Sequence, residues 1–220
     1  MAPKSRAANG VSARNEAQIR QHISAEAARI MSAEGVRDYH TAKRKAALRL
    51  NLPDTKNLPS NQEVETALRE YLHLFHAERL SVTLRRLREL ALEAMHFFAS
   101  FDPRLVGSVL SGTVTPESAI QLHIYADTPE EIGLLLHEHN IPFQETDRRL
   151  RYGGDRQQPC PVYRFTVDAS PIEVFVFGRE GVRERPLSPV DGRPMKRASI
   201  KDVEDLRAHM SARAWASSHD

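Results

Sequence analysis

Apolar side chains recur at intervals of three and four residues through the first hundred residues, which is the spacing of one face of an α-helix. The first stripe ends at Gly35 and the second before Pro53, residues that commonly terminate helices. The third and fourth stripes fit either one long helix or two helices with a break between His76 and Ser81. The four stripes are Ile19, Ile23, Ala27, Ile30 and Met31; Tyr39, Ala42, Ala46 and Leu50; Val64, Leu68, Tyr71 or Leu72, and Phe75; and Leu84, Leu87, Ala91, Ala94 and Phe98.

Two short polar motifs mark where helices begin. Ser60 is followed three residues later by Glu63, and Ser199 is followed by Asp202. In such a capping box the serine oxygen and the carboxylate each accept a hydrogen bond from a backbone N–H that the helix leaves without a partner. We therefore expect one helix to begin at Ser60 and the last helix to run from Ser199 to about Ala214.

After Pro103 the pattern changes to that of β-strands. Residues 120–125 alternate between apolar and polar, as a half-buried strand does. A helix is expected from Thr128 to Asn140, and the turn-rich residues 178–194 are expected to wrap the surface. The expected strands are Arg104–Val106, Ile120–Tyr125, Val162–Asp168 and Ile172–Phe177, the last two forming an antiparallel hairpin.

These elements predict an α+β fold, in which a mixed sheet with flanking helices is preceded by a helical N-terminal region. The 220 residues divide into a flexible basic arm (1–15), the helical region (16–79), an α/β domain (80–180), and a turn-rich segment with a C-terminal helix (181–220). No apolar run approaches the roughly 18 residues of a membrane span, and no secretory signal is present. The single cysteine, Cys160, excludes an intrachain disulfide. We expect a cytoplasmic protein without a membrane partner.

Positive charge is concentrated in the first 60 residues, which contain eleven lysines and arginines but only five acidic residues. The centre of this region is a basic patch that consists of Lys43, Arg44, Lys45 and Arg49. Such a patch can contact the phosphates of RNA or an acidic protein partner. A solvated helix face is the more common interpretation of a charge run.

The segment between the first two expected strands carries a distinctive spacing. Gly107-Ser108 is followed by three residues and Gly112, and then by five residues and a strand that begins with Ser118. This resembles the signature of the DNA-polymerase-β-like nucleotidyltransferase superfamily: a strand, Gly-Ser, three residues, Gly, a loop, and Ser-Asp-x-Asp on the next strand. The resemblance covers roughly residues 80–180. It implies that Gly107, Ser108, Gly112 and Ser118 lie near a bound nucleotide, since a glycine-serine turn lets backbone N–H groups approach phosphates.

In that family the two aspartates and a third carboxylate on a neighbouring strand hold two Mg²⁺ ions, which activate the attacking hydroxyl and stabilise the leaving pyrophosphate. Here Ala119 and Gln121 stand at the two aspartate positions, and Glu173 is the counterpart of the third acid. Alanine offers no ligand, and the neutral oxygen of glutamine binds Mg²⁺ less well than a carboxylate does. The resemblance therefore implies a domain with impaired metal binding. A single Mg²⁺, carried by a triphosphate and Glu173, is the alternative.

His123 lies two residues beyond Gln121 on the same strand, so both side chains point to the same face. The resemblance implies that His123 faces the nucleotide cleft, where an imidazole can bind a phosphate, a base or a metal. A lone histidine on a strand is more commonly an exposed polar residue. In the same way, Gly107 and Gly112 can be ordinary turn glycines, and Ser118 an ordinary turn residue.

Three functions follow from this sequence. The first is a non-catalytic nucleotidyltransferase-like module that binds a nucleotide, RNA or a protein partner, with the basic helices supplying contacts. The second is an active transferase with altered metal use, which moves a nucleotidyl group to RNA, a small molecule or a protein. The third is a structural or regulatory protein that keeps only the fold. Loss of the aspartate pair favours the first.

Overall fold

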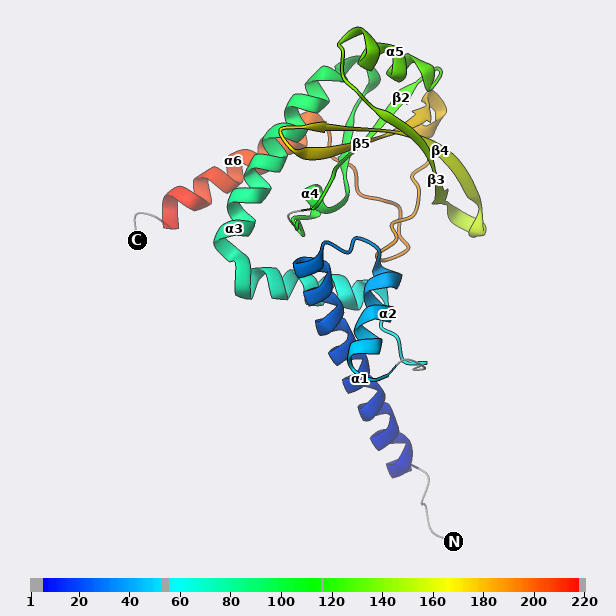
Figure 1. Cartoon of the computed structure of the whole chain (residues 1–220), viewed down its shortest axis with the longest axis vertical. Helices are drawn as coiled ribbons and strands as arrows, with labels where there is room; N and C mark the ends of the chain where they lie inside the picture. The colour runs from blue at the N-terminus through cyan, green and yellow to red at the C-terminus, as the bar shows by residue number, and fades with distance from the viewer. Residues whose placement is uncertain (1–5, 53–55, 116, 218–220) are drawn as a thin grey trace. The chain divides into compact units, whose positions relative to one another are not determined.

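The chain forms two compact units, which meet in the sequence between Ala77 and Glu78. The computed structural model describes residues 6–52, 56–115 and 117–217 (Figure 1). This described part contains six α-helices and one five-stranded mixed sheet. A mixed sheet preceded by a helical region is thus confirmed. The C-terminal residues, which we set apart from residue 181 onward, belong to the second unit.

The first unit is helical, as expected. It contains helix α1 (Arg6–Glu34), helix α2 (Tyr39–Arg49) and the first part of helix α3 (Asn61–Phe97). Residues 1–5 of the expected flexible arm lie outside the described residues, whereas residues 6–15 begin α1 instead of forming an arm. The apolar stripes face the interior, where the buried residues include Ile23, Ala27, Ile30, Ala42, Ala46, Val64, Leu68 and Leu72.

Helix α3 resolves the alternatives for the third and fourth stripes. It begins with the predicted capping box, in which Glu63 accepts a hydrogen bond from the Ser60 N–H at 2.7 Å and the Ser60 hydroxyl accepts one from the Glu63 N–H at 3.1 Å. The helix then runs on to Phe97 with a kink at His76, where the backbone is not helical (φ −139°, ψ 22°). The kink immediately precedes the division between the units. Phe75, which we placed on the buried stripe, is mostly exposed.

The second unit is built on a sheet with the strand order β1-β2-β5-β4-β3. Strands β2 and β5 are parallel and central, and the other neighbouring strands are antiparallel. The strands are β1 (Arg104–Val106), β2 (Ile120–Ala126), β3 (Gln144–Arg151), β4 (Gln157–Val167) and β5 (Ser170–Gly178). Because β2 and β5 are neighbours, two segments far apart in the sequence contribute adjacent side chains.

Strand β3 is absent from the sequence-based expectation. It is an edge strand whose residues are exposed or half-buried, so it shows no apolar alternation. Charged side chains on an edge strand also disfavour pairing with other chains. The expected hairpin of β4 and β5 is present, and its turn residues Asp168 and Ala169 have φ values of 47° and 60°. Two successive positive φ angles are typical of a tight type I′ hairpin turn.

Helices cover one face of this sheet. Phe98, which directly follows α3, packs against Phe165 of β4. The Tyr163 hydroxyl donates to the Pro129 carbonyl at the start of helix α5 (Glu130–Glu138). Residues 178–199 contribute to the opposite face, so every residue of β2 except Gln121 is buried. This double coverage explains why β2 is not the half-buried strand that we expected.

The C-terminal helix α6 (Ile200–Ser217) begins with the predicted second capping box, in which Asp202 accepts a hydrogen bond from the Ser199 N–H at 2.8 Å. The segment before it is joined to the sheet, because Leu105 and Ala198 exchange backbone hydrogen bonds. Within the described ranges, no helix combines the length and the apolar character that crossing a membrane requires.

Candidate functional site

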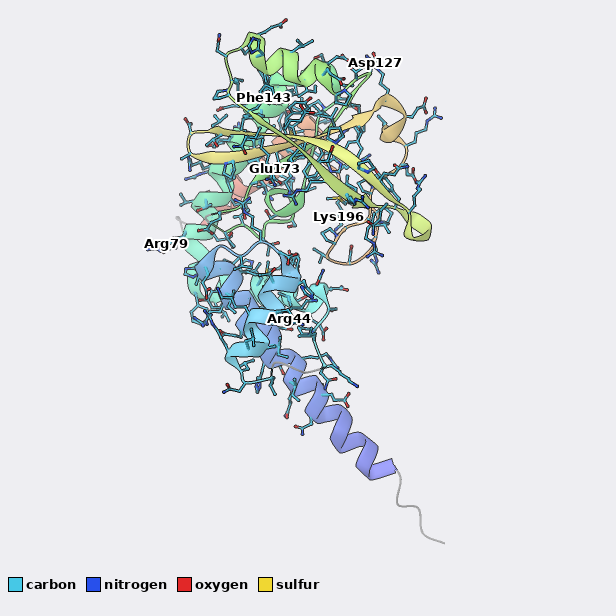
Figure 2. All side chains as sticks on the ribbon, turned by 45° about the vertical axis from the view of Figure 1, so that its right-hand side comes forward. Arg44, Arg79, Asp127, Phe143, Glu173 and Lys196 are labelled. Carbon is cyan, nitrogen blue, oxygen red and sulfur yellow. The ribbon has the colours of Figure 1, made fainter. Side chains whose placement is uncertain are left out.

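Strand pairing brings Gln121 and Glu173 together. The two residues are register partners on the parallel strands β2 and β5, and register partners point to the same face of a sheet. The Gln121 amide donates a hydrogen bond from Nε2 to Glu173 Oε2 at 2.9 Å. Figure 2 marks Glu173 among the strands of the second unit. The two residues that the resemblance aligns with the second aspartate and the third acid are thus in direct contact.

Two arginines that we did not identify from the sequence complete this cluster. Arg164 of β4 is the register partner of Glu173 on its other side, and its guanidinium lies 2.8 Å from Glu173 Oε1. Arg148 of β3 lies 3.6 Å from the same oxygen. The Glu173 side chain is only 6% exposed, whereas those of Arg164 and Arg148 are 37% and 49% exposed. A buried carboxylate requires such charge partners, and only the strand register reveals them.

The turn after β1 approaches this cluster closely. Helix α4 (Gly107–Ser111) begins at Gly107, which has a φ of +72°. A Cβ at this position would lie 2.3 Å from Gln121 Oε1, well inside van der Waals contact. The positive φ therefore favours glycine at position 107, and a Cβ there would displace the flexible end of the Gln121 side chain.

Gly112 and Ser118 have structural roles at this turn. Gly112 ends α4 with a φ of +84°, and its N–H donates to the Ser108 carbonyl at 2.8 Å. The Ser118 hydroxyl accepts a hydrogen bond from the Thr115 N–H at 2.9 Å and so closes the turn before β2. Both residues match the alternative of ordinary turn residues. Their proposed contacts with a nucleotide, like those of the half-buried Ser108, stay predictions.

A buried arginine of α3 holds α4 in place through hydrogen bonds. Arg88 of α3 is 6% exposed and donates hydrogen bonds to the carbonyls of Val109 and Leu110, each at 3.2 Å. A cation near the carbonyl end of a helix is electrostatically favourable. Burial lowers the pKa of Arg88 from its ordinary value. Arg88 therefore joins the glycine-serine turn to the long helix.

His123 shares a sheet face with Gln121, as predicted, but it is buried. Only 1% of the residue is exposed, and its ring lies against those of Phe175 and Phe177. Arg197 donates from Nε to His123 Nδ1 at 3.2 Å. Burial, together with the charge of Arg197, lowers the pKa of His123 to about 3. The alternative of an exposed polar residue is wrong, and the imidazole is a neutral acceptor within the core.

The donor set around Glu173 does not fit a pair of Mg²⁺ ions. Ala119 provides no ligand. One oxygen of Glu173 already accepts a hydrogen bond from Gln121, and the other forms an ion pair with Arg164. Arginine charge beside a carboxylate opposes the approach of a metal cation. Across the described ranges, no three His, Cys, Asp or Glu side chains are grouped in a way that could hold a metal ion.

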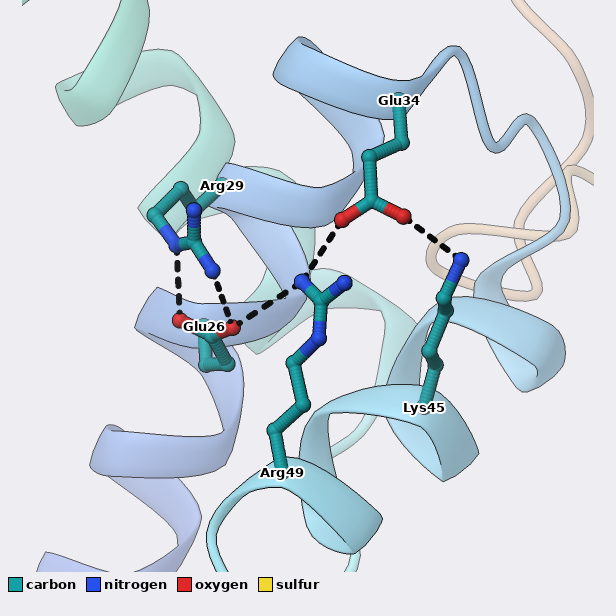
Figure 3. A network of polar contacts seen from close by, with 5 residues as sticks. All are labelled: Glu26, Arg29, Glu34, Lys45 and Arg49. Carbon is teal, nitrogen blue, oxygen red and sulfur yellow. Dashed lines mark hydrogen bonds and ion pairs between the residues drawn. The ribbon is translucent and has the colours of Figure 1, made fainter.

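The basic patch of the first unit is largely engaged in ion pairs, which Figure 3 shows. Lys45 lies 2.5 Å from Glu34, and Arg49 contacts Glu34 at 2.6 Å and Glu26 at 3.3 Å. Arg29 also pairs with Glu26 and, with the largest effect, lowers the pKa of that carboxyl. These acids neutralise much of the positive charge that the sequence places in this region.

The remaining patch residues differ from one another. Lys43 donates to the Pro59 carbonyl at 2.9 Å and to Asn61 Oδ1 at 2.8 Å, whereas Arg44 is exposed on α2. Three of the four residues thus hold the helices of the first unit together. The patch gives little support to the predicted RNA or protein partner.

Comparisons of this chain with protein-family models, with curated proteins and with solved structures find no significant match. A buried carboxylate is held by an amide and two arginines, beside a turn whose glycine has a positive φ.

Proposed function

We propose that the second unit is a nucleotidyltransferase-type domain that binds a nucleotide and lacks two-metal catalysis. The observation that carries this proposal is the meeting of Gly107, Gln121 and Glu173 at one point of the sheet. These residues come from β2, β5 and the turn after β1, which are the three places where the superfamily signature requires its turn and its acids. A chance match of the glycine spacing alone does not explain why the three segments converge.

The same contacts favour binding over catalysis. Two-metal transfer requires carboxylates that are free to hold cations, but Glu173 is enclosed by Gln121 and Arg164. An active transferase with altered metal use would need this carboxylate released from both partners. The proposed activity is therefore recognition of a nucleotide.

Calorimetric titration of the full chain with ATP, GTP, CTP and UTP, with and without Mg²⁺, tests this function. We expect saturable binding of at least one nucleotide. Gly107→Ala should weaken it about tenfold, because a Cβ at this position occupies space through which the backbone of the turn approaches the phosphates. Gly178→Ala is the matched control, because Gly178 has an ordinary φ of −61° and open space around it.

The other outcomes are equally informative. Absence of binding for all four nucleotides would contradict the proposal and would leave a structural or regulatory protein that retains the fold. Release of pyrophosphate in the presence of Mg²⁺ and an acceptor would instead support the active transferase. If Gly107→Ala and Gly178→Ala changed the nucleotide affinity equally, nucleotide binding would not depend on the turn at Gly107.

A further inference from the structure

Two guanidinium groups from adjacent strands converge on one carboxylate oxygen of the second unit. Arg164 and Arg148 lie 2.8 Å and 3.6 Å from Glu173 Oε1. Gln144 is the register partner of Arg164, and Arg148 lies four residues beyond Gln144 on β3, so all three side chains point to the same face. Strand pairing therefore places two positively charged side chains next to each other on the face that also carries Gln121.

Both arginines remain accessible while the carboxylate between them is buried. Their side chains are 37% and 49% exposed, against 6% for Glu173. A guanidinium has five N–H donors, and the contacts with Glu173 Oε1 involve one terminal nitrogen, Nη2, of each arginine. Two positive charges against one negative charge leave the cluster with an excess of one positive charge. Its solvent-facing side thus presents donors and positive charge.

This combination matches the chemistry of phosphate. Guanidinium groups bind phosphate oxygens through paired charge-assisted hydrogen bonds. In a two-metal site the charge of a triphosphate is balanced by cations that carboxylates hold, whereas here the cations belong to the protein itself.

We propose that Arg148 and Arg164 form a phosphate-binding pair that takes over the charge-balancing role of the metal ions, so that this domain binds the phosphate chain of a nucleotide without a divalent cation. The inference rests on the proposed function and names the ligand group and the residues that recognise it. Glu173 then neutralises one of the two guanidinium charges, so its carboxylate competes electrostatically with a bound phosphate for the pair.

Titration of the full chain with ATP in the presence of EDTA, and again with excess Mg²⁺, tests the pair. We expect binding without Mg²⁺. Arg148→Ala and Arg164→Ala should each weaken it about tenfold or more, as expected for the loss of charge-assisted hydrogen bonds. Inorganic tripolyphosphate should compete with ATP, because the phosphate chain is the group recognised. Arg164→Lys keeps the positive charge but loses the paired N–H donors of the guanidinium, so it should weaken binding several-fold. This variant replaces Arg164→Ala if the alanine variant does not fold.

The chain offers a matched control on the same strand. Arg149 is exposed and adjacent to Arg148, but it points to the opposite face of β3 because side chains alternate along a strand. Arg149→Ala should change the affinity by less than about twofold if only the pair contacts the phosphates. Equal losses for Arg148→Ala and Arg149→Ala would indicate diffuse electrostatic attraction and would overturn the inference.

Glu173→Gln separates this site from a metal site, because the two make opposite predictions. With an arginine pair, removal of the negative charge leaves phosphate binding unchanged or tighter. With a metal site, the same change abolishes binding. Binding that requires Mg²⁺, is lost in Glu173→Gln and is insensitive to both arginine substitutions would overturn the inference while leaving the proposed function intact. No binding of ATP or of any other nucleotide under any condition would overturn both.

Discussion

At the scale of single residues, Glu173 and His123 are both buried on one sheet face of the second unit, and their polar atoms are satisfied in different ways. Glu173 is surrounded by Gln121 and two arginines. His123 instead accepts one hydrogen bond from Arg197 between aromatic rings, and its pKa is lowered to about 3. Burial disfavours the charged form of an imidazole, so the stability of this unit depends on pH.

We predict that the second unit loses stability as the pH falls below about 6.5, the ordinary pKa of histidine. Since the folded-state pKa of His123 is depressed, the unfolded chain takes up this proton first. The contribution of His123 is therefore fully present above pH 6.5. It decreases by roughly 1.4 kcal/mol per pH unit as the pH falls toward 3.

Urea unfolding of wild type and His123→Gln between pH 7 and 4 measures this contribution. The glutamine oxygen can still accept from Arg197, and its variant should show a shallower dependence on pH. His96→Gln, at an exposed histidine, is the control and should leave the wild-type slope unchanged. Parallel curves for wild type and His123→Gln would contradict the prediction.

The hairpin turn supplies a second prediction for a single residue. Ala169 has a φ of 60°, a conformation that costs an L-residue with a Cβ about 1–2 kcal/mol and costs glycine almost nothing. Glycine also loses more entropy on folding, so Ala169→Gly should stabilise the protein by a net ~0.5–1 kcal/mol.

Chemical denaturation monitored by circular dichroism checks this increase. The same substitution at Ala25, an exposed helical position of α1, should cost about 1 kcal/mol because glycine disfavours helices. A loss of stability at position 169 would show that the turn does not strain alanine.

At the scale of elements, the glycine-serine turn depends on a helix that precedes it in the chain. Arg88 of α3 donates to the carbonyls of Val109 and Leu110 of α4. A five-residue helix has little stability of its own. The position of the proposed nucleotide site is therefore determined by packing against α3.

We predict that Arg88→Met loosens α4 and lowers stability by about 1–3 kcal/mol, the cost of leaving buried carbonyls without donors. Hydrogen exchange of residues 107–112 should become faster, and nucleotide binding should weaken. Arg85→Met is the control, because Arg85 is exposed on the same helix. If the hydrogen exchange of residues 107–112 were unchanged in Arg88→Met, Arg88 would not be needed to hold the turn in place.

At the scale of the whole molecule, the chain combines two units, each with its own buried core. The first consists of helices joined by apolar contacts and by the pairs among Glu26, Glu34, Lys45 and Arg49. The second contains the sheet and all the residues of the proposed site. A compact unit with its own core is generally able to fold alone.

We predict that a fragment consisting of residues 78–220 folds without the first unit and binds the same nucleotide with an affinity within about threefold of the full chain, provided that the site is complete within the unit. Cooperative urea unfolding and calorimetric titration of the fragment test this expectation. A fragment that folds but does not bind would assign part of the site to the first unit.

The sequence by itself determined the features that depend on local interactions. Helical periodicity identified the apolar faces of α1, α2 and α3, and the boxes at Ser60 and Ser199 identified helix starts, because a helix pairs residues three or four positions apart. The spacing after Gly107 also led to Glu173, although only by way of a resemblance.

Tertiary structure alone decided which residues became partners. The register of β4 and β3 selected Arg164 and Arg148 as the neighbours of Glu173, and residues 178–199 brought Arg197 over His123. The fold of the first unit paired Lys45 and Arg49 with Glu34, so these basic residues are engaged in ion pairs within the unit. Contacts between distant segments depend on strand order and on coverage of both sheet faces, and a charged edge strand such as β3 gives no apolar signal. A local window of the sequence contains neither kind of information.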